Sequence, residues 1–73
     1  MLKRGIYDKN GELFGYLIGD VIYDLNEART GYLQNGVVYA QNGEKQWIVQ
    51  GDGLYTPGGD SFGYLGEHYQ ETR

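Results

Sequence analysis

The sequence repeats one pattern four times at an interval of sixteen residues, with no insertion or deletion between residue 6 and residue 69. Each repeat opens with an aliphatic residue and a tyrosine, as in Ile6-Tyr7 and Ile22-Tyr23. Four equal units leave almost no room for anything else, so we expect a single domain over residues 1–73. The repeats cover residues 6–21, 22–37, 38–53 and 54–69.

The glycine content argues against helices. The chain has 13 glycines in 73 residues, and each costs about 0.8–1 kcal/mol relative to alanine inside a helix. The longest stretch without glycine runs from Asp20 to Thr30 and contains Val21-Ile22-Tyr23, which is typical of a strand. The sequence therefore predicts an all-β protein.

Each repeat predicts two strands and two turns. In the first repeat, Gly5–Asp8 and Glu12–Ile18 flank the turn Lys9-Asn10-Gly11, whose Asn–Gly pair supplies the positive φ that hairpin turns need. The second turn, Gly19-Asp20, leads into the next repeat. The four repeats together predict eight short strands in an antiparallel meander.

The length of the first turn decides which side chains share a face. Two-residue loops at both turns pair Ile6 with Gly15 and Tyr7 with Phe14, which separates aliphatic from tyrosine side chains. The alternative is a three-residue loop with a bulge at Gly11. It would mix the two sets in half of the strands, so the clean separation favours two-residue loops. The aliphatic face comprises Ile6, Leu17, Ile22, Leu33, Val38, Val49, Leu54 and Leu65. The tyrosine face comprises Tyr7, Tyr16, Tyr23, Tyr32, Tyr39, Tyr55 and Tyr64. Either face can form the interior, and the relative accessibility of Ile6 and Tyr7 distinguishes the two arrangements.

The small size of the chain favours a closed sheet. A chain of this length buries only about 60% of the surface that its unfolded form exposes, and it has no cysteine to add a disulfide. Pairing of the strand around Gly63–Leu65 with that around Gly5–Tyr7 would remove both unpaired edges. We therefore predict a shallow closed barrel with pseudo-four-fold symmetry, in which glycines relieve crowding where the strands curve. These glycines are Gly15, Gly31 and Gly63.

Several phrases of the sequence resemble the four-fold beta-flower family. They are Ile6-Tyr7-Asp8-x-Asn-Gly, Gly15-Tyr16-Leu17, Val21-Ile22-Tyr23-Asp24 and Gly31-Tyr32-Leu33. The resemblance covers residues 5–69 and implies a small symmetric barrel whose hairpins splay like petals. It implies no activity and no functional residue. The sequence departs from the pattern at Glu27, at Trp47-Ile48 and at Thr56-Pro57.

Aromatic side chains are the candidate binding residues. Tyrosine and tryptophan are common on recognition surfaces because they present large, rigid, amphipathic area. Trp47 stands where the other repeats have glycine, so we expect it at an interface; the alternative is that it plugs a gap at one end of the core. The alternative for the tyrosines is that they are ordinary strand residues with no binding role. The candidate binding residues are Trp47, Tyr7, Tyr23, Tyr39 and Tyr55.

The sequence predicts no catalytic or metal-binding residues and no cofactor. Carboxylates recur beside the first turns, as at Asp8 and Asp24, but an Asp before a turn commonly bonds local backbone N–H groups. The single histidine, His68, has no nucleophile in a recognisable motif, and the polar tail over residues 67–73 is expected to fray.

Bulk properties limit the partners. Six basic residues are spread along a chain of net charge −4, which argues against nucleic acid. No long apolar run or signal-peptide pattern is present, so we expect no membrane span and a cytoplasmic protein.

The function expected from the sequence is that of a non-enzymatic binding or assembly module with a protein partner or a second copy of itself. Two alternatives stay open: carbohydrate or small-ligand recognition by the tyrosines, and an acidic inhibitor that binds a basic partner surface.

Overall fold

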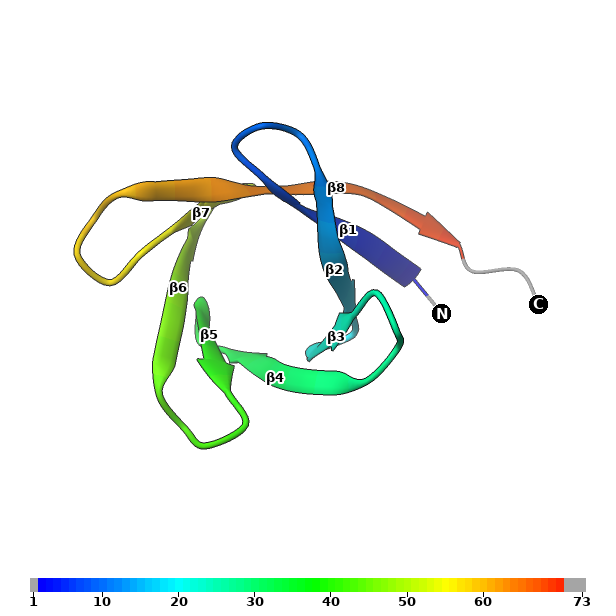
Figure 1. Ribbon diagram of the computed structural model, residues 1–73, viewed down its shortest axis with the longest axis horizontal. Coiled ribbons are helices and arrows are strands. Elements are labelled where there is room, and N and C mark those ends of the chain that lie inside the picture. The colour runs from blue at the N-terminus through cyan, green and yellow to red at the C-terminus, as the bar shows by residue number, and fades with distance from the viewer. Residues whose placement is uncertain (1, 71–73) are drawn as a thin grey trace.

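The computed structural model describes the backbone of residues 2–70 and the side chains of residues 3–67. Eight antiparallel strands follow the chain order and close into a barrel, with no helix among the described residues (Figure 1). The predicted all-β closed meander is thus confirmed. The strands are β1 (Leu2–Asp8), β2 (Leu13–Ile18), β3 (Val21–Asp24), β4 (Arg29–Gln34), β5 (Val37–Ala40), β6 (Lys45–Gln50), β7 (Gly53–Tyr55) and β8 (Ser61–Gln70).

The turns between repeats have the predicted length of two residues. Ile18 pairs with Val21 across Gly19-Asp20, and the turn at Asn35-Gly36 is closed in the same way. Positive φ at both Asn35 (53°) and Gly36 (79°) defines a type I′ turn, whose twist matches that of the flanking strands. These turns set the aliphatic residues of consecutive repeats side by side.

The turns inside the repeats are three residues long, so the preferred prediction of two-residue loops was wrong. In the first repeat the Asp8 amide donates to the Glu12 carbonyl and the Gly11 amide donates to the Asp8 carbonyl. Gly11 has a φ of 85°, which is the G1-bulge geometry of the alternative. The same two bonds recur in all four repeats, including the second, where Glu27 takes the positive-φ position.

A second irregularity next to each of these loops restores the register. Tyr7 pairs with Leu13 whereas Ile6 pairs with Gly15, which leaves Phe14 as an unpaired bulge residue. The extra residue in the loop shifts the pairing by one, and the bulge shifts it back before the core positions begin. This is why the aliphatic face survives a loop that would otherwise have mixed the two sets.

The aliphatic face forms the interior. Ile6 is almost fully buried while Tyr7 on the opposite face is half-buried, which answers the question that the sequence left open. Leu33 and Val49 are partly buried against the core. The buried core consists of Ile6, Leu17, Ile22, Val38, Trp47, Leu54 and Leu65.

The ends of the chain meet to close the barrel. β1 pairs with β8 through Ile6 and Leu65, and the pairing continues past the repeats to Lys3↔Tyr69 and Leu2↔Gln70. The predicted fraying of the tail was therefore wrong for Glu67–Gln70, because β1 extends far enough to pair with it. Residues 71–73 and the side chain of His68 lie outside the described part of the chain. Among the described residues no helix is long and apolar enough to span a membrane.

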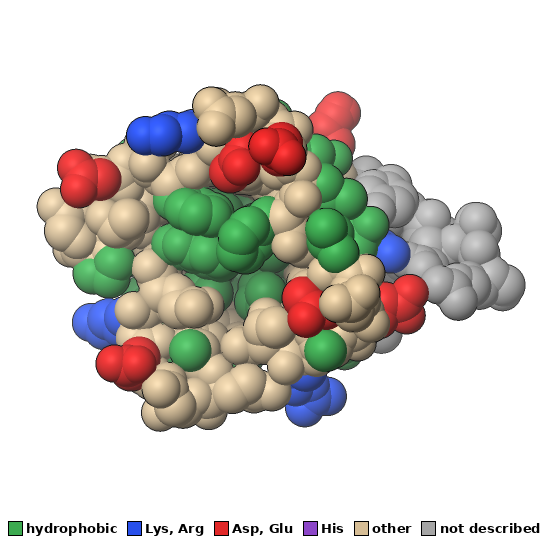
Figure 2. Space-filling view, in the orientation of Figure 1, with side chains coloured by type: hydrophobic (Ala, Val, Ile, Leu, Met, Phe, Trp, Pro, Cys, Tyr) green, Lys and Arg blue, Asp and Glu red, His purple; other side chains and the backbone are tan. Residues whose placement is uncertain are grey.

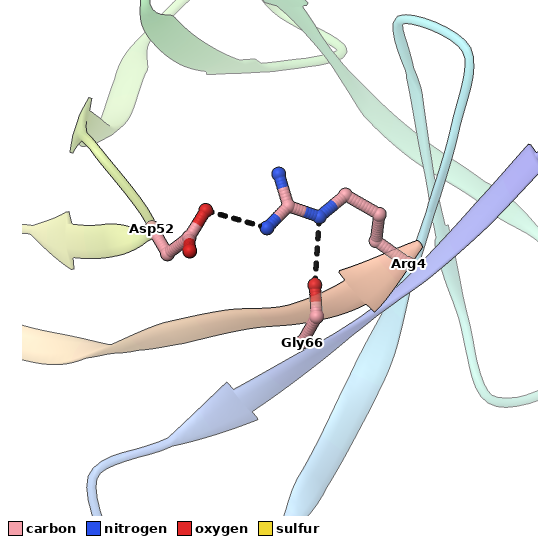
Figure 3. A network of polar contacts seen from close by, with 3 residues as sticks. All are labelled: Arg4, Asp52 and Gly66. Carbon is pink, nitrogen blue, oxygen red and sulfur yellow. Dashed lines mark hydrogen bonds and ion pairs between the residues drawn. The ribbon is translucent and has the colours of Figure 1, made fainter. Parts of the chain in front are cut away.

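Arg4 ties three segments together where the barrel closes (Figure 3). Its Nε donates to the carbonyl of Gly66 in β8 at 2.7 Å, and its Nη2 contacts Asp52 Oδ1, in the turn before β7, at 2.6 Å. The Arg4 side chain is only 14% exposed, whereas that of Asp52 is 74% exposed. The bond to Gly66 is thus the better shielded of the two.

We expect Arg4→Met to lower the free energy of unfolding by about 1–2 kcal/mol, because it leaves the Gly66 carbonyl without its charged donor. Asp52→Asn should cost about 0.5 kcal/mol or less, since solvent screens an ion pair with one exposed partner. Urea unfolding at low and high salt measures both. An equal cost for the two variants would contradict the greater weight given to the Gly66 bond.

Candidate functional site

The four bulges place one unpaired residue from each repeat at the same end of the barrel. Each bulge residue lies between a three-residue loop and the core positions, on β2, β4, β6 or β8. Because the repeats are related by the symmetry of the closed barrel, these residues share one level, and we call this the bulge end. The bulge residues are Phe14, Thr30, Gln46 and Phe62.

Half of the bulge end is filled by aromatic rings. Trp47 and Phe62 stack with their centroids 4.5 Å apart, and Phe14 meets both rings edge-on at 5.6 Å and 5.4 Å. Trp47 is 8% exposed and Phe14 is 49% exposed. The cluster therefore has a buried base and one side that faces solvent.

Trp47 occupies a position where the other repeats require glycine. A Cβ at Gly15 or Gly31 would overlap a carbonyl oxygen of the next strand, that of Tyr23 or Tyr39. In those repeats the glycine pairs with a residue of the strand that follows, as in Gly31↔Ala40. The β6–β7 ladder instead ends at Ile48↔Tyr55, so Trp47 has no partner on β7. The ladder is one pair shorter here, which makes room for the indole to turn inward.

The other half of the bulge end is hollow. A cavity of about 280 Å³ opens where the shorter side chains of Thr30 and Gln46 replace phenylalanine. Trp47 and Phe14 from the filled half form part of its wall. The lining residues are Phe14, Ile22, Tyr23, Asp24, Thr30, Gln46 and Trp47. Figure 2 shows one face of the molecule, on which hydrophobic side chains gather in the middle and charged side chains lie around the periphery.

Asp24 is the charged residue among those that line this hollow. Its Oδ1 accepts hydrogen bonds from the backbone amides of Asn26 at 2.8 Å and Ala28 at 2.9 Å. Asp8 makes the equivalent bonds in the first repeat, which confirms the prediction that these carboxylates bind the local backbone. Asp24 is therefore fixed in position among the residues that line the cavity.

The predicted tyrosines lie on separate seams, where a seam is the pairing between one repeat and the next. Tyr7 stacks on Tyr64 at 5.3 Å across the β1–β8 seam, and Tyr39 stacks on Tyr32 at 5.3 Å across the β4–β5 seam. Tyr55 faces Ile48 across a third seam. Of the five predicted binding residues, the structure brings together only Trp47 and Tyr23, at the hollow.

A second hollow, of about 240 Å³, lies beside Tyr23 on the outer face. It is lined by Lys3, Tyr16, Ile18 and Glu27 as well, and the Lys3 ammonium lies 4.0 Å from the centroid of the Tyr16 ring. Tyr16 thus contacts a cation within the chain itself. Among the described residues, no group of three or more His, Cys, Asp or Glu is placed to hold a metal ion.

The bulge residues Phe14 and Phe62 were missed as site residues by the sequence reasoning. They occupy one repeat position, which is aromatic in the first and fourth repeats and polar in the second and third. This difference between the repeats was the signal in the sequence that could have identified the position as part of a site. It has no meaning until the three-residue loops are known, because only they turn the position into a bulge.

Comparison with known proteins gives one match. A family model described as "4-fold beta flower protein" matches residues 4–55, which is more than half of the chain. Neither the curated proteins nor the solved structures that were compared with the chain include a match.

Proposed function

The chain belongs to the 4-fold beta flower family, and on that premise we propose that it is a non-enzymatic binding or assembly module that acts through the bulge end of its barrel. The family's description names a fold and no activity, so the proposal is based on this chain's own departures from symmetry. The observation that carries it is the half-exposed Phe14 beside a cavity whose wall includes Trp47.

The shape and chemistry of the bulge end support binding. Ligand cavities are typically concave and mostly apolar, with a few polar groups at fixed positions. Here Ile22 and Trp47 supply apolar surface, while Thr30, Gln46 and Asp24 supply polar groups. Asp24 uses one carboxylate oxygen to fix its own loop, which supports a positioning role over an acid–base role.

The bulge end is a better candidate surface than the tyrosines. Stacking on a sugar or another flat ligand needs aromatic faces that converge on one place. Tyr7 and Tyr39 instead stack against neighbouring tyrosines on different seams, which leaves less of each ring free. The acidic-inhibitor alternative is supported by the net charge of −4 alone.

Two small probes test where the chain binds. We expect indole, which mimics an aromatic side chain, to shift the NMR signals of the Trp47 ring N–H and of the amides of Phe14, Thr30 and Gln46. Methyl β-glucoside should leave them in place. Signals that move instead at the seam between Tyr7 and Tyr64 would favour the tyrosine alternative.

Phe14→Thr is the matched variant, because Thr30 occupies the same repeat position and shows that threonine fits a bulge. Loss of the ring should weaken indole binding by about 2- to 12-fold, the range that an aromatic contact contributes. Sedimentation of both proteins over a concentration series tests assembly. A mass that rises with concentration only in the parent protein would assign the bulge end to self-association. Indole that shifts nothing, combined with a constant monomer mass, would contradict the proposed function.

A further inference from the structure

We infer that the hollow at the bulge end binds a trimethylammonium group. This inference rests on the proposed function and names the chemistry of its ligand. Two aromatic residues from the cluster and one acidic residue belong to the lining of the hollow: Phe14, Trp47 and Asp24. Aromatic side chains that surround a space, with an anion near it, are the arrangement by which proteins recognise quaternary ammonium ions.

The aromatic walls are oriented to surround a round group. The rings of Phe14 and Trp47 are inclined at 76° with centroids 5.6 Å apart, so they form two sides of a corner. A cation is attracted when it lies within about 6 Å of a ring centroid, and a compact group in this corner meets more than one ring at once.

The one charged residue among those that line the hollow, Asp24, is acidic. Asp24 is held by two backbone amides, and no ion pair joins it to a lysine or arginine in the described part of the chain. Arg29 pairs with Tyr23 across the β3–β4 ladder but does not line the cavity. The net charge of −4 also favours a cation over an anion.

The lining favours a methylated ammonium over a free one. A free ammonium has three N–H donors that need acceptors and a tightly held hydration shell. A trimethylammonium has no donor, so it loses little on entering a cavity whose lining includes Phe14, Ile22 and Trp47. The chain already pairs a cation with an aromatic ring at Lys3 and Tyr16, which shows that such contacts form in this fold.

Choline and its neutral isostere 3,3-dimethylbutan-1-ol give the decisive comparison. The two molecules have nearly the same shape, and the isostere has carbon in place of the charged nitrogen. Trp47 is the only tryptophan of the sequence, so its fluorescence reports on the cavity directly. We expect choline to bind about 2- to 30-fold more tightly than the isostere, as a cation–π contribution implies, and to weaken as salt is added.

Three variants locate the effect. Phe14→Leu keeps apolar volume but removes a ring, so it should reduce the preference for choline over the isostere. Asp24→Asn keeps an oxygen for the loop amides but removes the charge, and should also reduce the preference. Asp8→Asn is the matched control, because Asp8 makes the same two bonds in another loop and does not line the cavity.

The source of the group is a separate arm of the experiment. Acetyl-trimethyl-lysine amide presents the same group on a protein side chain, and acetyl-lysine amide is its unmethylated control. Tighter binding of choline than of its isostere supports the inference, and comparison of choline with acetyl-trimethyl-lysine amide indicates whether the group comes from a small molecule or from a modified protein. Equal binding of choline and the isostere would overturn it while leaving the proposed function standing. So would indole binding without choline binding. If neither indole nor choline bound, the inference would fail, and the proposed function would fail with it if the protein also kept a constant monomer mass.

Discussion

Trp47→Gly is expected to destabilise the protein by about 3–5 kcal/mol, although it restores the residue that the other three repeats carry. The indole belongs to the buried core and stacks on Phe62 at 4.5 Å, so its removal leaves a large cavity. A chain of this length has a total stability of only about 4–11 kcal/mol. Denaturant unfolding, followed by circular dichroism because the variant lacks the fluorescent residue, measures the loss.

A neighbouring substitution provides the control. Ile48→Tyr also restores the repeat pattern, but on the outer face opposite Tyr55, where it should change stability by no more than about 0.5 kcal/mol. Trp47→Phe keeps part of the stacking on Phe62. We therefore expect this variant to fold even if Trp47→Gly does not. If Trp47→Gly proved as stable as the parent, the indole would have no part in the core, and symmetry alone would determine stability at this position.

Gly63→Ala is expected to cost up to about 3 kcal/mol, at the upper end of the range for overpacking. A Cβ at this position would overlap the carbonyl oxygen of Tyr7 and lie 2.8 Å from the Cα of Asp8, both of which are backbone atoms on β1. Neither atom can move aside without opening the Asp8↔Gly63 pair. Thermal unfolding of the variant, followed by circular dichroism, gives the cost.

Gly58→Ala separates this crowding from a general effect of replacing glycine. Its nearest neighbour for a new Cβ is Thr56 Oγ1 at 3.9 Å, and its φ is not positive. We expect a change of at most about 0.5 kcal/mol, with the sign set by the smaller entropy of the unfolded chain. A similar loss in both variants would show that the close approach at Gly63 is not what matters.

Much of the fold follows from the sequence because symmetry constrains it. The aliphatic residue that opens each repeat, such as Ile6 or Leu54, must occupy an equivalent place each time, and the structure buries both. Two-residue turns such as Asn35-Gly36 follow from local turn chemistry. Closure follows from the need of a small sheet to pair its edges.

The features that the sequence did not predict are those that cancel within a repeat. The three-residue loop before Glu12 and the bulge at Phe14 each shift the pairing by one residue, in opposite senses. The loop and the bulge leave the sixteen-residue period unchanged. A sequence with both features therefore shows the same repeat pattern as a sequence that has neither of them. The bulge end was hidden for this reason, and the inward turn of Trp47 depends on a ladder pair that is lost between β6 and β7.

The β1–β8 seam differs from the others in how the chain must find it during folding. The pairings within a repeat and between consecutive repeats join nearby residues, whereas Arg4 and His68 come together from opposite ends of the chain. Loop-closure entropy opposes such a distant contact until it is made. We therefore expect the hairpins to form early and the barrel to close last. The bond from Arg4 to Gly66 then stabilises the pairing of β1 with β8 once it has formed. We expect unfolding to begin at this same pairing, where the two ends of the chain meet.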